Sequence, residues 1–329
     1  MTPQLDWDPD ADSAQRAARV IALLALDAVV DARDSVRKRD AESVHEFRVA
    51  LRRLRAWIGL YRPSLDDTLR KRTRRRLAGI AHATTELRDL DVQVAWLIAE
   101  RKALGEPRLE AAEWIVRSLK TDRKQAWRRF RKVLARDFAR SEHDLRRELT
   151  RYVVTRDIRT REEIAGMRAV TTGLMGQQAE ALATAFARIR SPDDTKRLHH
   201  ARIVAKRTRY VLEALAPHQP ALSRVSDDLA RFQDVVGELR DAQLLAHRVT
   251  HEVTSVAAER TALVASELVY RPAGVMDFSR IVTESPFDAS LSLLFALLRD
   301  RISAASRTVS ASLHPDARRR LVSEIESAR

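Results

Sequence analysis

Two blocks of sequence occur twice in this chain, in the same order and at nearly the same offset. The first block is VHEFRVALRRLRAWIGLYRP at 44–63, and it returns as LHHARIVAKRTRYVLEALAP at 198–217. The second is LAGIAHATTELRD at 77–89, and it returns as LARFQDVVGELRD at 229–241. An ordered pair of repeats at a nearly constant spacing indicates an internal duplication. We therefore expect two halves of the chain to fold into related structures.

Residues 44–63 have the periodicity of an amphipathic helix. At about 100° per residue, Phe47, Leu51 and Leu54 point to one side, which we expect to face a core. The opposite side is basic, and four of its residues stand within about 80° of one another. We call the basic residues of this block the first basic row: His45, Arg48, Arg52, Arg53 and Arg55.

The second copy of the block repeats this basic side. We call its basic residues the second basic row: His199, Arg202, Lys206, Arg207 and Arg209. Lys206 stands where the first row has Arg52, so a point charge replaces a planar fork that can bind phosphate oxygens in pairs. The two halves are therefore not expected to bind an anion equally well.

Each row contains basic residues alone. A helix face that only meets solvent usually mixes acidic and basic residues three or four positions apart. Like charges at that spacing cost a few tenths of a kcal/mol each unless an anion is supplied. A solvated face is the simplest interpretation of one such row, but the recurrence of the row favours a shared site for a polyanion.

The composition favours an all-α protein with an anionic partner. Glycine and proline are scarce, with 8 and 10 residues, and no alternating strand pattern stands out. The net charge of +14 is compatible with nucleic acid, an anionic membrane face or a polyanionic polymer. No apolar run approaches the roughly 18–20 residues that a membrane span needs. The acidic start is not a signal peptide, and a cytoplasmic location is the simple interpretation.

The paired motifs resemble the CHAD family, the conserved histidine α-helical domain. The resemblance rests on H-x-x-R-x-x-x-R-R-x-R at 45–55, on its partly altered copy at 199–209, and on the LRD block that follows each. It implies an all-α fold of two tandem pseudo-symmetric four-helix bundle units. It also implies binding of inorganic polyphosphate along a central basic channel, and a location on polyphosphate granules.

The resemblance and the helical periodicity together predict the domain organisation. We expect a flexible acidic leader at 1–12, a CHAD domain at 13–313 and a polar C-terminal tail at 314–329. Within the domain we expect a first helical repeat at 13–137, a linkage at 138–165 and a second repeat at 166–313. Three local signals refine these bounds: a capping box of Ser43 and Glu46, a helix start at 191–194, and LRD blocks that open new helices.

Other basic residues are secondary candidates for the anion site. Arg72 and Arg76 share one side of a helix that carries an arginine run, and Lys120 and Lys124 form a further stripe. The run at 70–76 has no counterpart in the second half, so a solvated helix competes with binding there. We interpret Arg88-Asp89 and Arg240-Asp241 as structural pairs.

Catalysis finds little support in the sequence. It contains no glycine-rich phosphate loop, no nucleophile motif and no cysteine, and its histidines lack the usual metal-ligand spacings. We therefore expect a non-enzymatic protein without a metal or cofactor. Two alternatives stay open: a basic helical nucleic-acid-binding protein, and a metal-assisted enzyme of phosphate-polymer metabolism. The absence of aromatic residues from both rows disfavours the first, because aromatic rings are what stack on bases.

Overall fold

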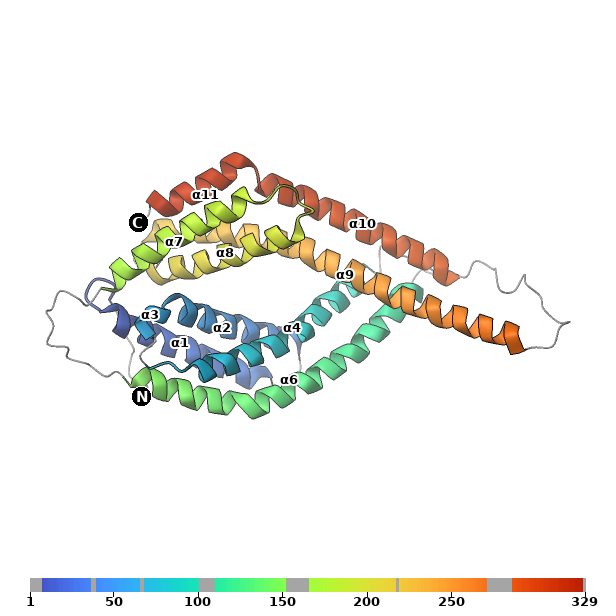
Figure 1. The fold of residues 1–329 in the computed structure, drawn as a ribbon, viewed down its shortest axis with the longest axis horizontal. Helices are drawn as coiled ribbons and strands as arrows, with labels where there is room; N and C mark the ends of the chain where they lie inside the picture. The colour runs from blue at the N-terminus through green and yellow to red at the C-terminus, as the bar shows by residue number, and fades with distance from the viewer. Residues whose placement is uncertain are drawn as a thin grey trace. The chain divides into compact units, whose positions relative to one another are not determined.

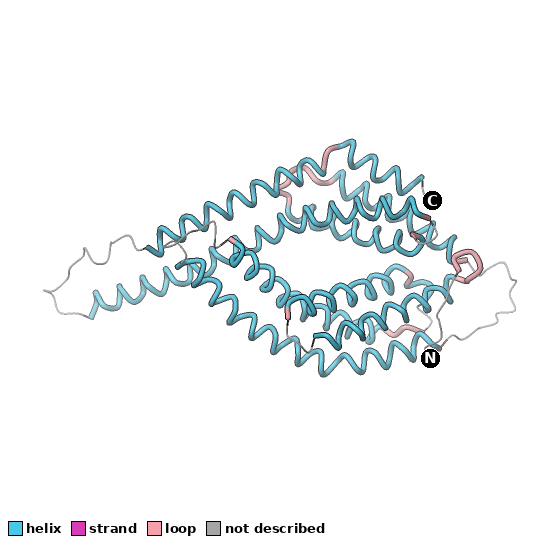
Figure 2. The backbone as a smooth tube through the Cα atoms, turned by 180° about the vertical axis from the view of Figure 1, so that it is seen from behind, coloured by secondary structure: helices cyan, strands magenta, loops and turns pink. Residues whose placement is uncertain are grey.

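The protein is all-α in every part that the computed structural model describes. These parts are residues 8–36, 40–65, 68–100, 110–151, 166–216, 219–270 and 286–327. Within them the helices are α1 (Ala14–Ser35), α2 (Ala41–Leu60), α3 (Arg62–Leu65), α4 (Lys71–Ala99), α6 (Glu110–Thr150), α7 (Met167–Ala187), α8 (Thr195–Leu215), α9 (Pro220–Tyr270), α10 (Pro286–Ser312) and α11 (Pro315–Ser327) (Figure 1). Figure 2 shows only helices and short connections along this described backbone. The predicted fold class is confirmed.

The chain divides into two compact units, and each draws on both halves of the sequence. The first compact unit comprises Met1–Arg88, Gln125–Val236 and Thr308–Arg329, and the second comprises Asp89–Lys124 and Gly237–Arg307. These units cut across the predicted helical repeats. The repeat boundaries are compatible with the helix order but stay a prediction.

In the first compact unit, α1 packs on α2, α7 packs on α8, and α2 meets α8. The apolar side of α2 is buried as predicted, with Phe47, Leu51 and Leu54 fully shielded from solvent. The Phe47 ring lies 6.0 Å from that of Phe130 and 5.9 Å from that of Phe138, both on α6. This aromatic cluster fixes the rotation of α2, so the opposite side of the helix must carry the first basic row.

Polar contacts also join the long helices of the second compact unit, whose buried side chains include Leu97, Ile115 and Leu298. Arg123 on α6 pairs with Asp91 on α4. The Ser118 hydroxyl on α6 donates to the Glu252 carboxylate on α9 at 3.1 Å. The guanidinium of Arg301 on α10 lies 4.8 Å from the centre of the Trp96 ring.

Both motif helices begin after an aspartate N-cap, which differs from the predicted start of α2 and lies within the predicted start of α8 at 191–194. The Asp40 carboxylate accepts the Ser43 backbone N–H at 2.7 Å, so Asp40 is the N-cap of α2 and the predicted Ser43–Glu46 capping box is wrong. That hydrogen bond is the main reason why the pKa of Asp40 lies below its usual value. In α8 the cap is Asp194, which accepts from Arg197 N at 3.3 Å. Serine and aspartate are almost equally good caps, so sequence alone ranks them poorly.

The LRD blocks lie inside helices instead of opening them. Leu87, Arg88 and Asp89 continue α4, and 239–241 continue α9. The predicted linkage at 138–165 is helical as far as Thr150, where α6 ends. Residues 152–165 lie outside the described residues, as does the segment 271–286, whose sequence predicts a loop, except for Pro286, which begins α10.

The described parts of the predicted leader and tail are both tied to α7. Backbone N–H groups of Met167 and Arg168 donate to Asp12 O and Pro9 O, each at 3.0 Å, and Arg168 also pairs with Asp10. These contacts hold residues 8–12, which the sequence predicted to be flexible. The predicted polar tail contains α11, which packs on α7 and buries Leu321 and Ile325. None of the described helices is both long and apolar enough to cross a membrane.

Candidate anion-binding site

The two motif helices bring the two basic rows together within the first compact unit. Arg52 on α2 donates its Nε hydrogen to the hydroxyl of Tyr210 on α8, at 2.9 Å. Next to it in the sequence, Arg53 on α2 places its Nε 3.2 Å from the carboxylate of Glu213, also on α8. The sequence predicted that the rows share one site; α2 and α8 meet in this unit, and a shared anion site stays a prediction.

Lys206 lies among the arginines of both rows. It is half-buried, and this burial is the main cause that lowers the pKa of its ammonium group to about 7. The further causes are four positive charges, Arg52, Arg202, Arg48 and Arg209, in that order of effect. Two come from α2 and two from α8, so the positive charge is concentrated where the helices face each other. A bound anion would relieve this repulsion.

Neighbouring groups orient the arginines around Lys206. The Nε hydrogen of Arg202 is donated to the backbone carbonyl of Gln233 on α9, at 2.8 Å. The Arg209 guanidinium lies 5.7 Å from the centre of the Tyr210 ring, within the range of a cation–π contact. The site is therefore built on three helices and not on α2 and α8 alone.

His45 lies half-buried at the N-terminal end of the first basic row. Burial lowers the pKa of its imidazole, and the charges of Arg88, Arg52 and Arg48 lower it further, while Glu42 opposes them. At neutral pH the ring is therefore mostly neutral and offers one N–H donor. His199 holds the matching position on α8 and is also half-buried. A neutral ring at His45 can donate one hydrogen bond to an anion, and the same role for His199 stays a prediction.

The outer members of the rows are more accessible to solvent. Arg53, Arg55 and Arg207 are exposed, with 57% of the Arg53 side chain accessible. Glu213 approaches both rows, since it also lies 3.3 Å from Arg209 Nε. Each row therefore contains only basic residues in the sequence, but in the structure Glu213 lies next to a member of each row.

The secondary candidates lie in other surroundings. Arg76 on α4 forms an ion pair with Asp144 on α6, and its hydrogen bond to that carboxylate is the main cause that holds the pKa of Asp144 below its usual value. Arg72 is exposed and acts on the same carboxylate from a distance. Arg76 therefore has a structural partner that the sequence did not reveal. Lys120 and Lys124 are exposed and belong to the second compact unit, so their place in the same groove stays a prediction.

Sequence reasoning missed several residues that shape this site. Tyr210, Gln233 and Glu213 contact the rows, but none is part of the duplicated basic pattern. Arg88 was interpreted as half of a structural pair, whereas its charge acts on His45. The sequence contains one signal for a role of Arg88 near the basic rows. Arg88 belongs to the second repeated block, which follows the basic block in each half.

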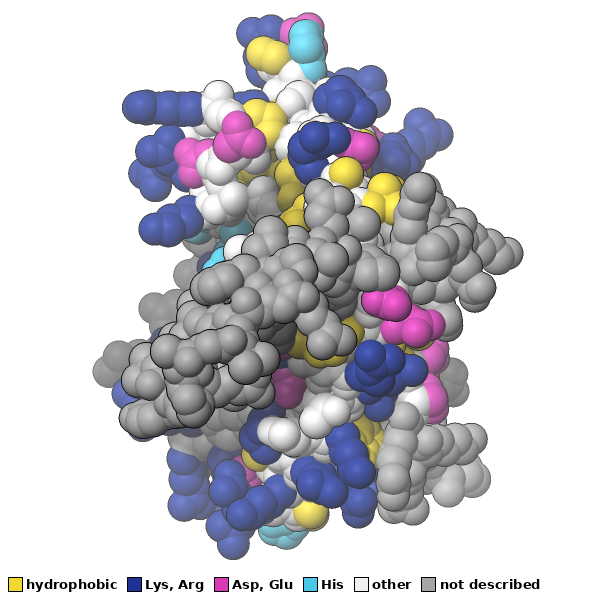
Figure 3. All heavy atoms as spheres, turned by 90° about the vertical axis from the view of Figure 1, so that its right-hand side faces the viewer, with side chains coloured by type: hydrophobic (Ala, Val, Ile, Leu, Met, Phe, Trp, Pro, Cys, Tyr) yellow, Lys and Arg dark blue, Asp and Glu magenta, His cyan; other side chains and the backbone are white. Residues whose placement is uncertain are grey.

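Basic side chains also dominate part of the outer surface. On the face shown in Figure 3, Lys and Arg predominate over Asp and Glu among the side chains that are described. A surface of this kind attracts polyanions over a distance of about one Debye length, near 8 Å at physiological salt. No three His, Asp or Glu side chains cluster as metal ligands would within the described residues.

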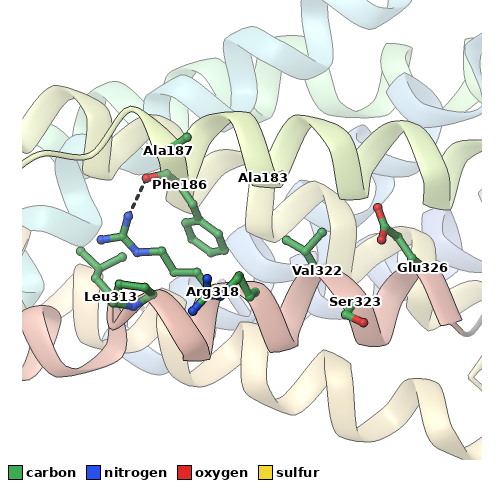
Figure 4. Close-up of a pocket in the computed structure, with 10 residues that line it drawn as sticks. Ala183, Phe186, Ala187, Leu313, Arg318, Val322, Ser323 and Glu326 are labelled. Atoms are coloured by element: carbon green, nitrogen blue, oxygen red, sulfur yellow. Dashed lines mark hydrogen bonds between the residues drawn. The ribbon is translucent and has the colours of Figure 1, made fainter.

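A pocket of about 480 Å³ lies between α7 and α11, and none of its lining residues belongs to the basic rows. Its walls are largely apolar, with Phe186 and Val322 facing one another, as Figure 4 shows. At one end Arg318 donates an Nη1 hydrogen to the Phe186 carbonyl at 2.7 Å (Figure 4). This arginine secures α11 to the end of α7 and so serves packing.

Comparison with known proteins gives the same family as the sequence motifs. The family model of the CHAD domain matches residues 20–250. The crystal structure of the CHAD domain from the plant Ricinus communis superposes with a TM-score of 0.59 at 20% identity, covering 85% of this chain and 92% of that chain. PptA from Streptomyces chartreusis superposes with a TM-score of 0.60 at 14% identity, covering 92% and 99%. No curated protein matches the chain. Since the family match spans more than half of its length, the protein belongs to the CHAD family.

Proposed function

We propose that the protein binds inorganic polyphosphate along the facing sides of α2 and α8. One observation carries the proposal: Lys206 is half-buried among four arginines that come from both helices. Like charges at this density destabilise the folded chain unless a partner compensates them. Membership of the CHAD family supports the same ligand, because the family is linked to polyphosphate.

The chemistry of the rows suits a chain of phosphates. Arginine forks donate two N–H groups to phosphate oxygens, and each neutralised phosphate releases condensed counterions. Binding should therefore be strong at low salt and fall steeply as salt rises. Neither base pairing nor sequence readout is required.

Nucleic acid is the rival ligand of the same charge. The ring of Tyr210 contacts Arg209 of the second row, but it is 3% exposed and its hydroxyl accepts a hydrogen bond from Arg52. A ring in this position has no open face on which a base could stack. We therefore expect long-chain polyphosphate to displace duplex DNA and RNA at equal phosphate concentration. Preferential binding of either nucleic acid would contradict the proposal.

Charge reversal in the rows is the direct test. Arg48→Glu with Arg52→Glu, and Arg202→Glu with Lys206→Glu, should each weaken polyphosphate binding by about tenfold or more at low salt, since contacts are lost and repulsion is added. Binding is measured by titration with polyphosphates of graded length. The first pair should have the larger effect, because it removes two forks.

A matched control for these variants lies on α11. Arg319→Glu with Arg320→Glu changes the net charge by the same amount as either motif pair. Both side chains are exposed, at 77% and 74%, and pair only locally with Asp316 and Glu324. Arg318 is unsuitable because it holds α11 to α7. Equal loss of affinity in the control and the motif variants would assign binding to overall charge instead of to the rows.

The proposed activity is binding and not turnover. Incubation of the purified protein with polyphosphate and Mg²⁺ or Mn²⁺ should release no phosphate above background. Release that His45→Ala abolishes would establish an enzyme in place of a binding protein. The proposal extends to a location on polyphosphate granules, which imaging of the tagged protein with and without the row reversals would test.

A further inference from the structure

Glu213 lies between the two basic rows and pairs with an arginine from each. Its Oε2 is 3.2 Å from Nε of Arg53 on α2, and its Oε1 is 3.3 Å from Nε of Arg209 on α8. The first half has Gly59 at the matching position, so this carboxylate is not part of the duplicated pattern. The chain therefore supplies an anion of its own to the site for which the proposed ligand is an anion.

The geometry of these ion pairs is that of weakly held contacts. In each pair the shortest distance to the carboxylate is from Nε, at 3.2 Å or more, and the Nε of Arg209 is buried without a hydrogen-bond partner among the described residues. The side chains of Arg53 and Glu213 are 57% and 29% exposed, so water and salt reach the pair. Ion pairs of this kind contribute little, and salt weakens them further. A phosphate group that accepts two N–H groups from one fork binds more strongly.

We propose that Glu213 is an internal competitor, which occupies Arg53 and Arg209 until a phosphate group of the bound polymer displaces it. The inference rests on the proposed function and names a residue that limits affinity at that site. In the free protein the carboxylate reduces the repulsion between the two arginines. In the complex it is a like charge beside the phosphates, so binding includes the cost of moving it aside.

This role differs from that of an interhelical bridge, which would predict the opposite effect on binding. If Glu213 mainly held α2 to α8, its loss would loosen the site and weaken the ligand. If it competes with the ligand, its loss strengthens binding. The direction of the affinity change therefore separates the two roles.

The test is Glu213→Gln, which keeps the shape of the side chain and removes its charge. We expect affinity for long-chain polyphosphate to rise about three- to tenfold at low salt. The plot of log affinity against log salt should steepen by about 0.7 for each additional phosphate engaged. The matched control is Glu324→Gln on α11, which removes an acid that pairs with Arg320 at 3.1 Å and has the same effect on net charge.

Each result decides the inference. A gain in Glu213→Gln that exceeds the gain in Glu324→Gln, and that Arg53→Gln in the same chain cancels, supports competition. Unchanged or weaker binding by Glu213→Gln overturns it, and a fall in melting temperature together with weaker binding would assign the residue to bridging. The wild-type titration is read first: if wild type does not bind polyphosphate, the proposed function itself fails, whereas binding by wild type without a gain in the variant refutes only the role of Glu213.

Discussion

Raising the pH from 6 to 8 should weaken polyphosphate binding, because Lys206 loses its proton over this range in the free protein. Burial, followed by the charges of four arginines, lowers its pKa to about 7 from a usual value of 10.5. A phosphate group beside the ammonium adds the negative charge that is missing, so the pKa in the complex returns toward its usual value. Binding therefore takes up a proton at neutral and mildly alkaline pH.

The size of the effect follows from the fraction of protonated Lys206. With a pKa of about 7, the free protein carries this proton in about 90% of molecules at pH 6 and in about 10% at pH 8. If the complex keeps the proton throughout, affinity scales with these fractions and falls about tenfold between the two values. The pKa of His45 is also lowered, mainly by its burial and next by the charge of Arg88.

Calorimetric titration in two buffers of different ionisation enthalpy measures both the affinity and the proton uptake. The control is Lys206→Arg, which restores the residue type of Arg52 at the matching position and stays charged at every pH in the range. We expect this variant to bind with little dependence on pH above 7 and more tightly than wild type at pH 8. If wild type and the variant lose affinity equally as the pH rises, another group controls the dependence and the reasoning from Lys206 is wrong.

Three further predictions concern the same surroundings. Without ligand, the free energy of unfolding should rise between pH 7 and pH 10, because the unfolded chain keeps a proton on Lys206 that the folded chain has lost. Each pH unit contributes at most about 1.4 kcal/mol, reduced by solvent screening. Urea unfolding of Lys206→Met should show a weaker dependence of stability on pH. Arg76→Ala should lower the free energy of unfolding by about 2 kcal/mol, since it leaves the buried Asp144 with only one of the two arginines that pair with it, Arg147. Polyphosphate affinity should stay unchanged, and a large loss of affinity would restore Arg76 as a site residue. Tyr210→Phe should weaken binding by about 1 kcal/mol, because Arg52 loses the hydroxyl that orients it, and a titration equal to that of wild type would show that this hydrogen bond has no role in binding.

The sequence predicted the fold class and the faces of the motif helix because both depend on periodicity. Burial of Phe47, Leu51 and Leu54 follows from their spacing alone, and the basic side opposite them follows equally. Duplication added the expectation that the rows meet, since two related halves can present equivalent surfaces to one another. Periodicity and repetition are properties of the chain itself, so they can be interpreted without a structure.

The remaining features depend on which residues meet in space. Tyr210 and Glu213 are unremarkable in the sequence and gain their roles because α8 places them against Arg52 and Arg53. The predicted start of a helix was wrong where several residues could serve as its N-cap, as at Asp40. The polar composition of 314–329 hid a helix because two apolar residues, Leu321 and Ile325, are enough to anchor it.

The contacts between residues 8–13 and the start of α7 have a consequence for the order of folding. They join positions that are about 150 residues apart in the chain, and closing a loop of that length costs about 4 kcal/mol of chain entropy. The side chains of Asp10 and Arg168 are 63% and 37% exposed, so solvent screens their ion pair and the contact itself returns little of that cost. These contacts can therefore form only after the helices on either side have packed, and they should be among the first parts of this unit to open.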